Sequence, residues 1–414
     1  MELALALDES LPLPLYRQLY EGLRDSILSG RLAPGQRVPS SRVLARQLCV
    51  SRNTVSQAYA ELEAEGYLSG RHGSGTYVST ELPDEPVQAR PEGWRSSEAP
   101  PRRGPVVSRR WSTREGAGSA ERQLRPPRGL PYDFHPAQGA WDVFPQETWR
   151  RLLARHWRRS WREAMDYGDP AGYRPLREEV AAYLARSRAV RCTPDEVVIV
   201  NGTQQALDLL ARILLEPGDP VAVENPGYRA ARQVFATYDA LLVPVPVDRE
   251  GMVVERMRGT GARLALVTPS HQFPTGAVLS LPRRLSLLSW ARTEGVLVVE
   301  DDYDSEFRFE GRPLASLQGL DDSGSVVYLG SFSKVLFPSL RVGYAVLPPD
   351  LVRPFEEAKD LTDRQTPMLE QQVLAGFLGE GHFERHLRRM RQLYRSRRGA
   401  LVEALGRHLG DRIR

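Results

Sequence analysis

Residues 326–334 read VVYLGSFSK, an apolar run followed by a glycine, two serines and Lys334. Short apolar runs of this kind are typical of buried strands, so residues 326–329 are predicted to form a strand with Lys334 just beyond its carboxyl end. Arginine supplies nearly all of the positive charge, and Lys334 and Lys359 are the only lysines in the chain. Chemistry that requires a lysine amine therefore has two candidates.

Further apolar runs precede this one at residues 197–200, 221–223, 241–245, 264–267 and 296–299, and helical stretches separate them. Short apolar strands that alternate with helices indicate an α/β domain whose mostly parallel sheet is covered on both faces. In such sheets ligands bind beyond the carboxyl ends of the strands. The polar residues that follow each run are therefore the first candidates for a functional site.

The chain has 414 residues, of which 41% are hydrophobic, and a net charge of +4. This length predicts two or three folded units, while the modest charge says little about nucleic acid. The apolar runs fall short of the roughly 18 residues of a membrane span, and residues 1–7 lack a basic leader, which predicts a cytoplasmic protein. Cys49 and Cys192 lie far apart and are expected to be buried, unpaired thiols.

The N-terminal region carries the pattern of a winged helix-turn-helix. Apolar residues at every fourth position predict a helix from Leu15 to about Gly30, and Ser40 precedes a second, short helix. Ser51 can cap a third helix. The apolar face of this third helix consists of Val55, Ala58, Tyr59 and Leu62. Residues 67–78 hold two short β-prone segments around a glycine-rich turn, which predicts the hairpin of a wing.

Residues 81–130 are rich in Pro, Arg, Ser, Gly and Glu and show no sustained hydrophobic period. This composition predicts a flexible linker between a DNA-binding domain at residues 1–80 and an α/β domain at residues 131–414. The arginine pairs at residues 102–103 and 109–110 could contact phosphates, although a solvated tether fits the composition better.

Polar residues of the third helix lie opposite its apolar stripe, near the end that enters the major groove in helix-turn-helix proteins. The preceding helix can contact phosphates, and the tip of the wing can reach the minor groove. The candidate DNA-binding residues are Arg42, Ser51, Arg52, Asn53, Thr54, Ser56, Gln57, Arg71, His72 and Gly73. The helices alone leave a protein-binding module as an equal alternative.

The segment from Pro14 to Val78 resembles the winged-helix domain of the GntR family of bacterial repressors. The motifs that carry the resemblance are residues 39–42 (PSSR), 44–45 (LA), 50–55 (VSRNTV), 58–59 (AY) and 65–68 (EGYL). They follow one another at the spacing of the family and span the whole first domain. The resemblance implies a double-stranded DNA operator as the partner of this domain.

The neighbours of Lys334 are typical of a site that binds a phosphorylated aldehyde. Ser331 and Ser333 precede it, and Arg341 follows one loop later. A lysine amine forms an imine with an aldehyde, and hydroxyls and an arginine can hold a phosphate beside it. The Ser-x-Ser-Lys pattern alone is weak, because short patterns of this kind also occur in surface loops.

Asp301, Asp302 and Tyr303 follow another predicted strand. Asp301 is predicted to face a pyridinium nitrogen and keep it protonated, while the Tyr303 phenol faces the hydroxyl of the same cofactor. The alternative is a divalent metal site built from Asp301, Asp302, Asp304 and Glu306. Successive side chains of a strand point to opposite faces, which disfavours their convergence on one ion.

The strand at residues 197–200 leads into a second predicted phosphate contact. Gly202, Thr203 and Gln204 open the helix that follows, and the free backbone amides of a helix start bind phosphate. Tyr228 comes after the next strand and supplies a ring for stacking. A packed tyrosine in a turn explains Tyr228 equally well.

Residues 132–414 resemble the fold-type I pyridoxal-phosphate enzymes of the aminotransferase class. Together with the GntR-like domain they resemble the MocR (GabR-like) subfamily of GntR transcription regulators. The motifs are residues 167–173 (YGDPAGY), 201–206 (NGTQQA), 226–228 (PGY), 269–276 (PSHQFPTG), 300–308 (EDDYDSEFR) and 331–334 (SFSK). The resemblance implies an α/β PLP-dependent transferase-like fold, with a mostly parallel sheet between helices, preceded by a small winged helix-turn-helix domain.

The resemblance also implies roles for individual residues. Pyridoxal 5'-phosphate is the implied cofactor, Lys334 its imine partner, Asp301 the partner of its ring nitrogen, Tyr303 that of its hydroxyl, and Tyr228 the stacking ring. The implied phosphate-binding residues are Ser331, Ser333, Arg341, Gly202, Thr203 and Gln204. Tyr167 is implied to reach the phosphate of a neighbouring subunit, which predicts a head-to-tail homodimer with composite sites.

Two departures from the family bear on catalysis. Phe273 stands where aminotransferases usually carry an asparagine that bonds the cofactor hydroxyl. The sequence ends at Arg414, whereas the family continues with a small-domain sheet that carries a carboxylate-binding arginine. We therefore expect the domain to lack this sheet and to act as a sensor of pyridoxal phosphate, an amino acid or an amine.

Two alternative functions stay open at this point. One is a pyridoxal-phosphate-dependent aminotransferase with an attached DNA-binding module, which requires a carboxylate anchor and proton transfer by Lys334. A partial transaminase half-reaction is compatible with the sensor as well. The other is a DNA-binding protein whose cofactor domain serves only for dimerisation, which the retained imine and phosphate residues disfavour.

Overall fold

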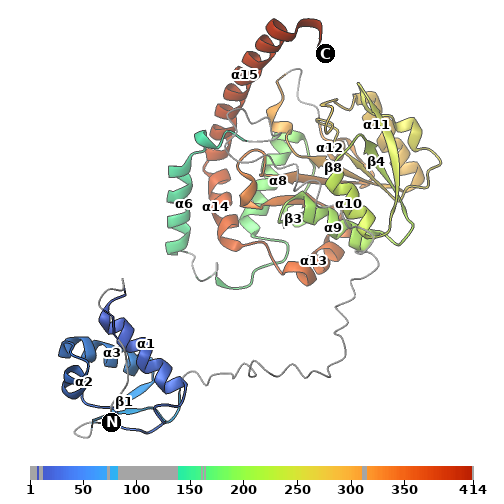
Figure 1. Cartoon of the computed structure of the whole chain (residues 1–414). Coiled ribbons are helices and arrows are strands. Elements are labelled where there is room, and N and C mark those ends of the chain that lie inside the picture. Colours follow the sequence, from blue (N-terminus) through green and yellow to red (C-terminus); the bar gives the residue numbers. More distant parts are fainter. Residues whose placement is uncertain are drawn as a thin grey trace. The chain divides into compact units, whose positions relative to one another are not determined.

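The computed structural model describes residues 7–8, 13–71, 75–82, 139–159, 162, 165–309 and 315–412 (Figure 1). The chain divides into two compact units, Met1–Val106 and Val107–Arg414. Apart from Glu81 and Leu82, the predicted linker at residues 81–130 lies outside the described residues.

The first unit is a winged helix-turn-helix, as the sequence predicts. Its helices are α1 (Leu15–Leu28), α2 (Ser41–Gln47) and α3 (Arg52–Ala64), and its hairpin pairs β1 (Leu68–Arg71) with β2 (Gly75–Val78) in antiparallel register. The predicted apolar stripes meet in one core, in which Leu19, Leu23, Val55 and Leu62 are fully buried. This core fixes α3 against α1 and leaves the polar face of α3 outside.

Serine caps determine where the two helices of the helix-turn-helix begin. Ser40 Oγ accepts a hydrogen bond from the Val43 N–H at 3.4 Å, and Ser51 Oγ accepts one from the Thr54 N–H at 3.1 Å. Such caps contribute about 1 kcal/mol each. The cap at Ser51 therefore places the residues that follow it in the first turn of α3.

The second unit contains an eight-stranded sheet in the order β3-β10-β9-β8-β7-β4-β5-β6. The strands are β3 (Val197–Val200), β4 (Pro220–Asn225), β5 (Leu241–Asp248), β6 (Gly251–Met252), β7 (Leu264–Val267), β8 (Leu297–Asp302), β9 (Val326–Ser331) and β10 (Gly343–Val346). The pairs β4/β5, β4/β7, β7/β8 and β8/β9 are parallel, as predicted. The sequence analysis missed β6 and β10, which pair antiparallel with their neighbours. Because β10 runs opposite to both β3 and β9, these two strands end at the same edge.

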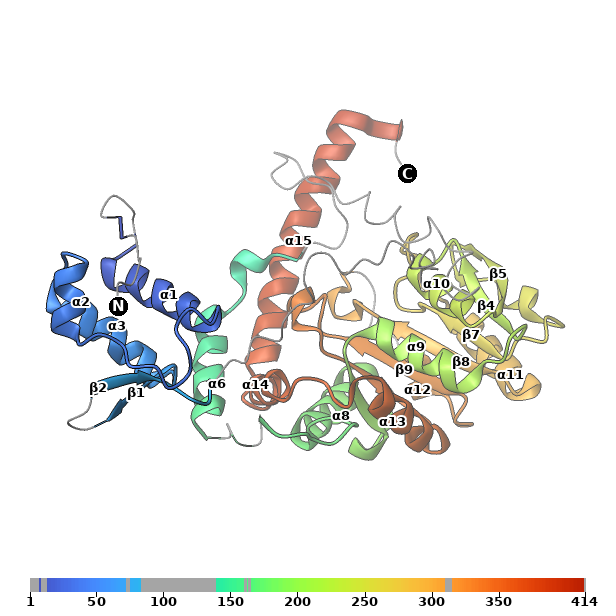
Figure 2. The ribbon, with the colours of Figure 1, turned by 60° about the horizontal axis from the view of Figure 1, so that its bottom comes forward.

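Helices cover both faces of this sheet (Figure 1, Figure 2). The helices described in the second unit are α6 (Gln146–Arg159), α8 (Arg174–Arg188), α9 (Thr203–Leu214), α10 (Arg229–Thr237), α11 (Leu281–Glu294), α12 (Leu317–Leu320), α13 (Pro349–Asp363), α14 (Met368–Gly379) and α15 (His382–Leu409). Alternate residues of β3 show the two-sided burial. Val197 and Ile199 pack with α8 and α14, whereas Val198 and Val200 pack with α9.

The prediction that both cysteines are buried is wrong. Cys49 is exposed and Cys192 is half-buried, and both are free thiols. Cys49 lies in the turn between α2 and α3, outside the core that the two helices share with α1. Within the described residues, no helix combines the length and the apolar character that a membrane crossing requires.

Candidate cofactor site and DNA-binding face

A cavity of about 390 Å³ lies beyond the carboxyl ends of the parallel strands. Its lining residues are Gly202, Thr203, Gln204, Tyr228, Thr268, Phe273, Asp301, Tyr303, Ser331, Ser333, Lys334, Pro338 and Arg341. The structure thus brings together ten of the eleven residues that the sequence analysis places around a cofactor. The eleventh, Tyr167, is 81% exposed and does not line this cavity.

Lys334 lies shortly after the end of β9 and lines the cavity. Partial burial lowers the pKa of its amine, while the carboxyl groups of Asp304 and Asp301 oppose this shift. A lowered pKa raises the fraction of uncharged amine, which is the form that attacks an aldehyde. Lys359 is fully buried in α13, bonds Asp363 at 2.8 Å and does not line the cavity. Of the two lysines, Lys334 is therefore the one placed for a ligand.

Asp301 lies near the end of β8 and is 5% exposed. Its Oδ1 atom is buried and has no hydrogen-bond partner among the described residues. Burial, together with the charges of Asp302, Glu224 and Asp304, raises the pKa of the Asp301 carboxyl group to about 7. A buried hydrogen-bond acceptor destabilises the folded protein unless a donor is bonded to it. A protonated ring nitrogen is such a donor, so the orphaned oxygen fits the pyridinium of pyridoxal phosphate.

The start of α9 and Arg341 form a cradle for an anion. Gly202 has a φ of +94°, and a Cβ atom there would lie 2.9 Å from Nη2 of Arg341, so glycine permits this close approach. No side chain caps α9, and the amides of Gln205 and Ala206 donate to the Gly202 carbonyl, which leaves those of Thr203 and Gln204 for a ligand. Ser331 and Ser333 stand beside the cradle, and the Ser333 N–H donates to Ser331 Oγ at 3.1 Å. This set of donors fits a phosphate.

Three aromatic rings also line the cavity. Phe273 makes edge-to-face contacts with Tyr228 and Tyr303, and the ring centroids are 6.1 and 6.4 Å apart. Burial and the negative charge of Asp304 raise the pKa of Tyr303, so its phenol keeps the proton that it can donate. Phe273 contributes only hydrocarbon at the position where the aminotransferase pattern has an asparagine.

Asp302 takes part in a buried polar cluster that the sequence analysis missed. Its Oδ2 accepts hydrogen bonds from Arg188 Nε at 2.7 Å, from Ser305 Oγ at 2.8 Å and from the Tyr328 hydroxyl at 2.5 Å. Arg188 comes from the end of α8 and is 8% exposed. The cluster therefore anchors the segment that carries Asp301 and Tyr303 into the cavity.

The acidic residues of the alternative metal site have separate surroundings. Asp301 faces the cavity, and the partners of the others are Arg188 for Asp302, His271 for Asp304 and Tyr183 for Glu306. In the part of the chain that the structure describes, no three possible metal ligands come together. The geometry gives the metal alternative no support.

Thr268 is a lining residue that the sequence analysis missed. It directly follows β7, so the rule that singled out the ends of other strands also points to it. Its hydroxyl donates to Glu224 Oε2 at 2.5 Å, and Gln272 Nε2 donates to the same oxygen at 3.1 Å. Because Glu224 is 6% exposed and belongs to β4, these bonds tie the loop that carries Phe273 to the sheet.

Half of the ten DNA-binding candidates are exposed on the two helices of the helix-turn-helix. The exposed candidates on α2 and α3 are Arg42, Arg52, Asn53, Ser56 and Gln57. Ser51 and Thr54 form the cap of α3 instead, with their hydroxyl oxygens 2.8 Å apart. Arg71 ends β1, whereas His72 and Gly73 lie outside the described residues. The structure therefore describes the predicted DNA-binding residues on α3, whereas the predicted residues at the tip of the wing lie outside the described part of the chain.

Arg52→Ala is expected to weaken binding to operator DNA by about 1–3 kcal/mol, roughly 5- to 150-fold, because Arg52 at the start of α3 is predicted to contact the major groove. Fluorescence anisotropy with intergenic DNA next to the gene measures this loss. Arg31→Ala removes the same charge from an exposed position after α1 and serves as the control. Equal weakening by both variants would contradict the docking of α3 on DNA.

Two family models match the chain, one in each unit. Residues 15–78 match the bacterial regulatory proteins of the gntR family, and residues 137–411 match aminotransferase class I and II. The chain belongs to the GntR-type transcription regulators that carry an aminotransferase class I and II domain.

The chain is 44% identical over 407 residues to the "Probable rhizopine catabolism regulatory protein MocR" of Rhizobium meliloti, across 98% of this chain and 80% of that protein. It is 32% identical to the "HTH-type pyridoxine biosynthesis transcriptional regulator PdxR" of Corynebacterium glutamicum, across 98% of this chain and 82% of that protein. A solved structure of LysN, the alpha-aminoadipate aminotransferase of Thermus thermophilus, complexed with N-(5'-phosphopyridoxyl)-L-leucine, is 36% identical. It superposes with a TM-score of 0.65 over 73% of this chain and 78% of that one.

These similarities confirm the predicted fold class, the cofactor and the general function. The chain is a DNA-binding transcription regulator with a pyridoxal-phosphate-dependent domain. The roles of the individual cavity and α3 residues remain predictions.

Proposed function

We propose that Lys334 holds pyridoxal phosphate through an imine, and that an amino acid, an amine or the cofactor itself alters operator binding through this bond. The convergence of ten predicted residues in one cavity is the observation that carries the proposal. When bound, pyridoxal phosphate supplies an aldehyde carbon that can form an imine with one amine and then with another in its place.

Different residues of the cavity suit different groups of pyridoxal phosphate. Lys334 supplies an amine whose pKa is lowered by burial. Asp301 offers its unpaired Oδ1 to a ring N–H, and the Tyr303 phenol donates to a neighbouring oxygen. The amides that follow Gly202 and the guanidinium of Arg341 hold a phosphate in place. All the residues to which these roles are assigned line the cavity.

An effector can change DNA affinity only if it favours one arrangement of the regulator over another. We propose that the regulator is a homodimer in which Tyr167 contributes to the site of the second copy. Its 81% exposure in a single chain is compatible with this role, because an inward-facing tyrosine would line the cavity of its own chain. Since the partner is operator DNA, we also propose a cytoplasmic location.

The alternative of a full aminotransferase is favoured by the fold but not by the cavity. The Phe273 side chain has no hydrogen-bonding group to offer the cofactor hydroxyl. Steady production of a keto acid from an amino donor and acceptor would favour the aminotransferase over the sensor. The sensor needs imine exchange alone, without the proton transfers of a complete catalytic cycle.

Borohydride trapping tests the proposed attachment directly. Reduction of the holoprotein is expected to leave a phosphopyridoxyl group on Lys334, because borohydride supplies hydride that converts an imine to a secondary amine, which does not hydrolyse. Since Lys359 is the only other lysine, peptide mass spectrometry separates the two outcomes cleanly. A label on Lys359, or no label in protein that was saturated with cofactor, would contradict the proposal.

A further inference from the structure

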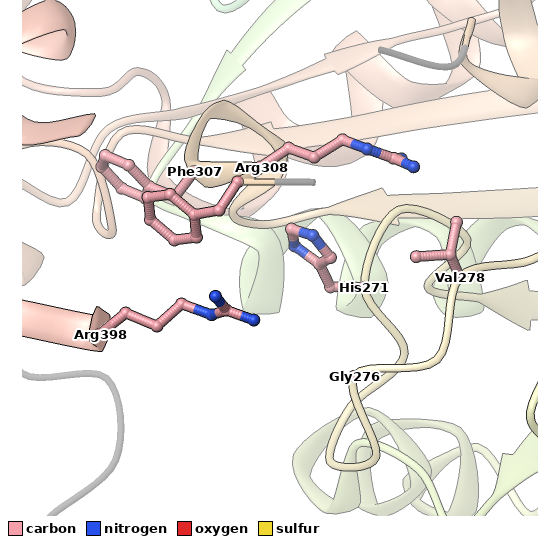
Figure 3. Close-up of a pocket in the computed structure, with 7 residues that line it drawn as sticks. His271, Gly276, Val278, Phe307, Arg308 and Arg398 are labelled. Atoms are coloured by element: carbon pink, nitrogen blue, oxygen red, sulfur yellow. The ribbon is translucent and has the colours of Figure 1, made fainter. Parts of the chain in front are cut away.

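The second lysine of the chain, Lys359, is fully buried near the end of α13. Among the described residues, it lines neither the cofactor cavity nor a second cavity, which has His271, Arg308 and Arg398 in its wall (Figure 3). The amine of Lys359 therefore has no direct contact with a ligand in either cavity. Any part that it plays in ligand binding must act through its neighbours.

Helix stability does not account for a lysine at this position. The Lys359 amine donates a hydrogen bond to Asp363 Oδ1 at 2.8 Å, and the two residues form an i,i+4 ion pair in α13. Asp363 is the last residue of α13, where the helix dipole disfavours a carboxylate. A buried ion pair is also often no more stabilising than apolar residues of similar volume. The purpose of the pair is therefore to be sought in the other bonds of Asp363.

The second carboxylate oxygen of Asp363 holds the turn at the start of α9. Asp363 Oδ2 accepts hydrogen bonds from Gln205 Nε2 at 2.6 Å and from Asn201 Nδ2. Gln205 Oε1 in turn accepts one from the Asn201 backbone N–H at 2.7 Å. The carboxylate therefore fixes the turn on both sides of Gly202.

The same turn positions Arg341. The Asn201 carbonyl accepts a hydrogen bond from Arg341 Nη2. Arg341 and the first amides of α9 are the groups to which the proposed function assigns the phosphate. A continuous chain of hydrogen bonds thus runs from the buried Lys359 amine to the donors of the anion cradle.

The charge of Lys359 matters as well as its hydrogen bond. A phosphate monoester carries up to about two negative charges at neutral pH. The Asp363 carboxylate holds the turn to which that phosphate would bind, and like charges repel more strongly where water is excluded. A cation paired with Asp363 removes most of this repulsion.

We propose that Lys359 is a positioning residue for the phosphate group of the cofactor. It neutralises the Asp363 carboxylate, which can then hold the turn around Gly202 without repelling the phosphate. The inference rests on the proposed function, because the cradle matters only when a phosphate occupies it. The two lysines then have separate tasks: Lys334 binds the aldehyde carbon, and Lys359 acts on the phosphate end through other residues.

The test compares pyridoxal phosphate with pyridoxal, which has the same ring and aldehyde but no phosphate. Both compounds are titrated into the cofactor-free 414-residue chain, and imine absorbance at Lys334 reports binding. Lys359→Met is expected to lower the preference for pyridoxal phosphate over pyridoxal roughly tenfold, because charge-assisted hydrogen bonds to the phosphate are weakened. A purely structural role of Lys359 would weaken both compounds alike and leave this preference unchanged.

Two further variants separate the charge from the hydrogen bonds. The double variant Lys359→Met with Asp363→Asn has no uncompensated carboxylate and keeps an amide oxygen as an acceptor, so it should regain much of the lost preference. Gln205→Leu leaves the ion pair of α13 intact and removes the bonds of Gln205 to Asp363 and to the Asn201 N–H. It should also lower the preference, and it provides the test if Lys359→Met does not fold.

Arg353→Met is the matched control. It removes a cation from the same helix, but the Arg353 side chain is 89% exposed and pairs with Glu357 at 2.9 Å. This variant should keep the full preference for pyridoxal phosphate.

Two results would overturn the inference. One is a wild-type preference in folded Lys359→Met or in Gln205→Leu, and the other is a double variant that binds pyridoxal phosphate no more tightly than Lys359→Met. Each leaves the proposed function standing, since the imine at Lys334 still forms. The absence of any imine absorbance in the wild type is a different result, which refutes the proposed function itself.

Discussion

Lys334→Ala is expected to abolish the imine absorbance and to leave operator binding unresponsive to amines. The variant removes the amine that lines the cavity, while Asp301, Arg341 and the start of α9, which are predicted to bind the cofactor without a covalent bond, stay in place. Titration with pyridoxal phosphate, followed by visible absorbance and by anisotropy with operator DNA, measures both effects.

Lys334→Arg is the control that separates charge from imine formation. It keeps a cation beside Asp301 and Asp304 but offers no primary amine, so it should match Lys334→Ala in absorbance and in the lost response. Normal regulation by either variant would show that the imine has no part in signalling.

Arg188→Met is expected to lower the free energy of unfolding of the second unit by about 3–5 kcal/mol, because breaking a buried ion pair leaves one charge without its partner. The Asp302 side chain that would lose its cation is fully buried. Methionine keeps much of the volume of arginine, so the lost charge dominates the change. The same variant should weaken cofactor binding, since Asp302 stands between Asp301 and Tyr303.

Urea unfolding followed by tryptophan fluorescence measures the effect of Arg188→Met, because Trp149 and Trp290 belong to the second unit. Arg174→Met is the control: its partner Asp195 has a side chain that is 74% exposed, so the midpoint should stay unchanged. A loss below about 1 kcal/mol for Arg188→Met would show that the cluster around Asp302 does not anchor the site.

The cavity residues could be predicted because they follow strands in sequence. Asp301, Lys334 and Gly202 each lie at or just after a strand end, and parallel strands bring their carboxyl ends to one edge. The same rule would have found Thr268. Arg188 could not be found this way, because 114 residues separate it from Asp302 and no periodic pattern links a helix end to a distant strand.

The remaining differences have local causes. The sequence analysis missed β10, which is short and runs antiparallel between β3 and β9. One short apolar run also does not reveal the direction in which a strand runs. Cys49 belongs to a turn, where small apolar residues need not enter the core. Phe273 was identified from the family pattern, but its contacts with Tyr228 and Tyr303 depend on loops that meet only in the folded chain.

The most direct test of the central claim is the affinity of the holoprotein for its operator, measured before and after an amine has displaced the imine at Lys334. Displacement is monitored by absorbance in the same sample. We predict that the dissociation constant changes by roughly tenfold or more, which corresponds to a coupling of about 1.4 kcal/mol between the two sites. An unchanged dissociation constant at complete displacement would contradict a regulator that senses through Lys334.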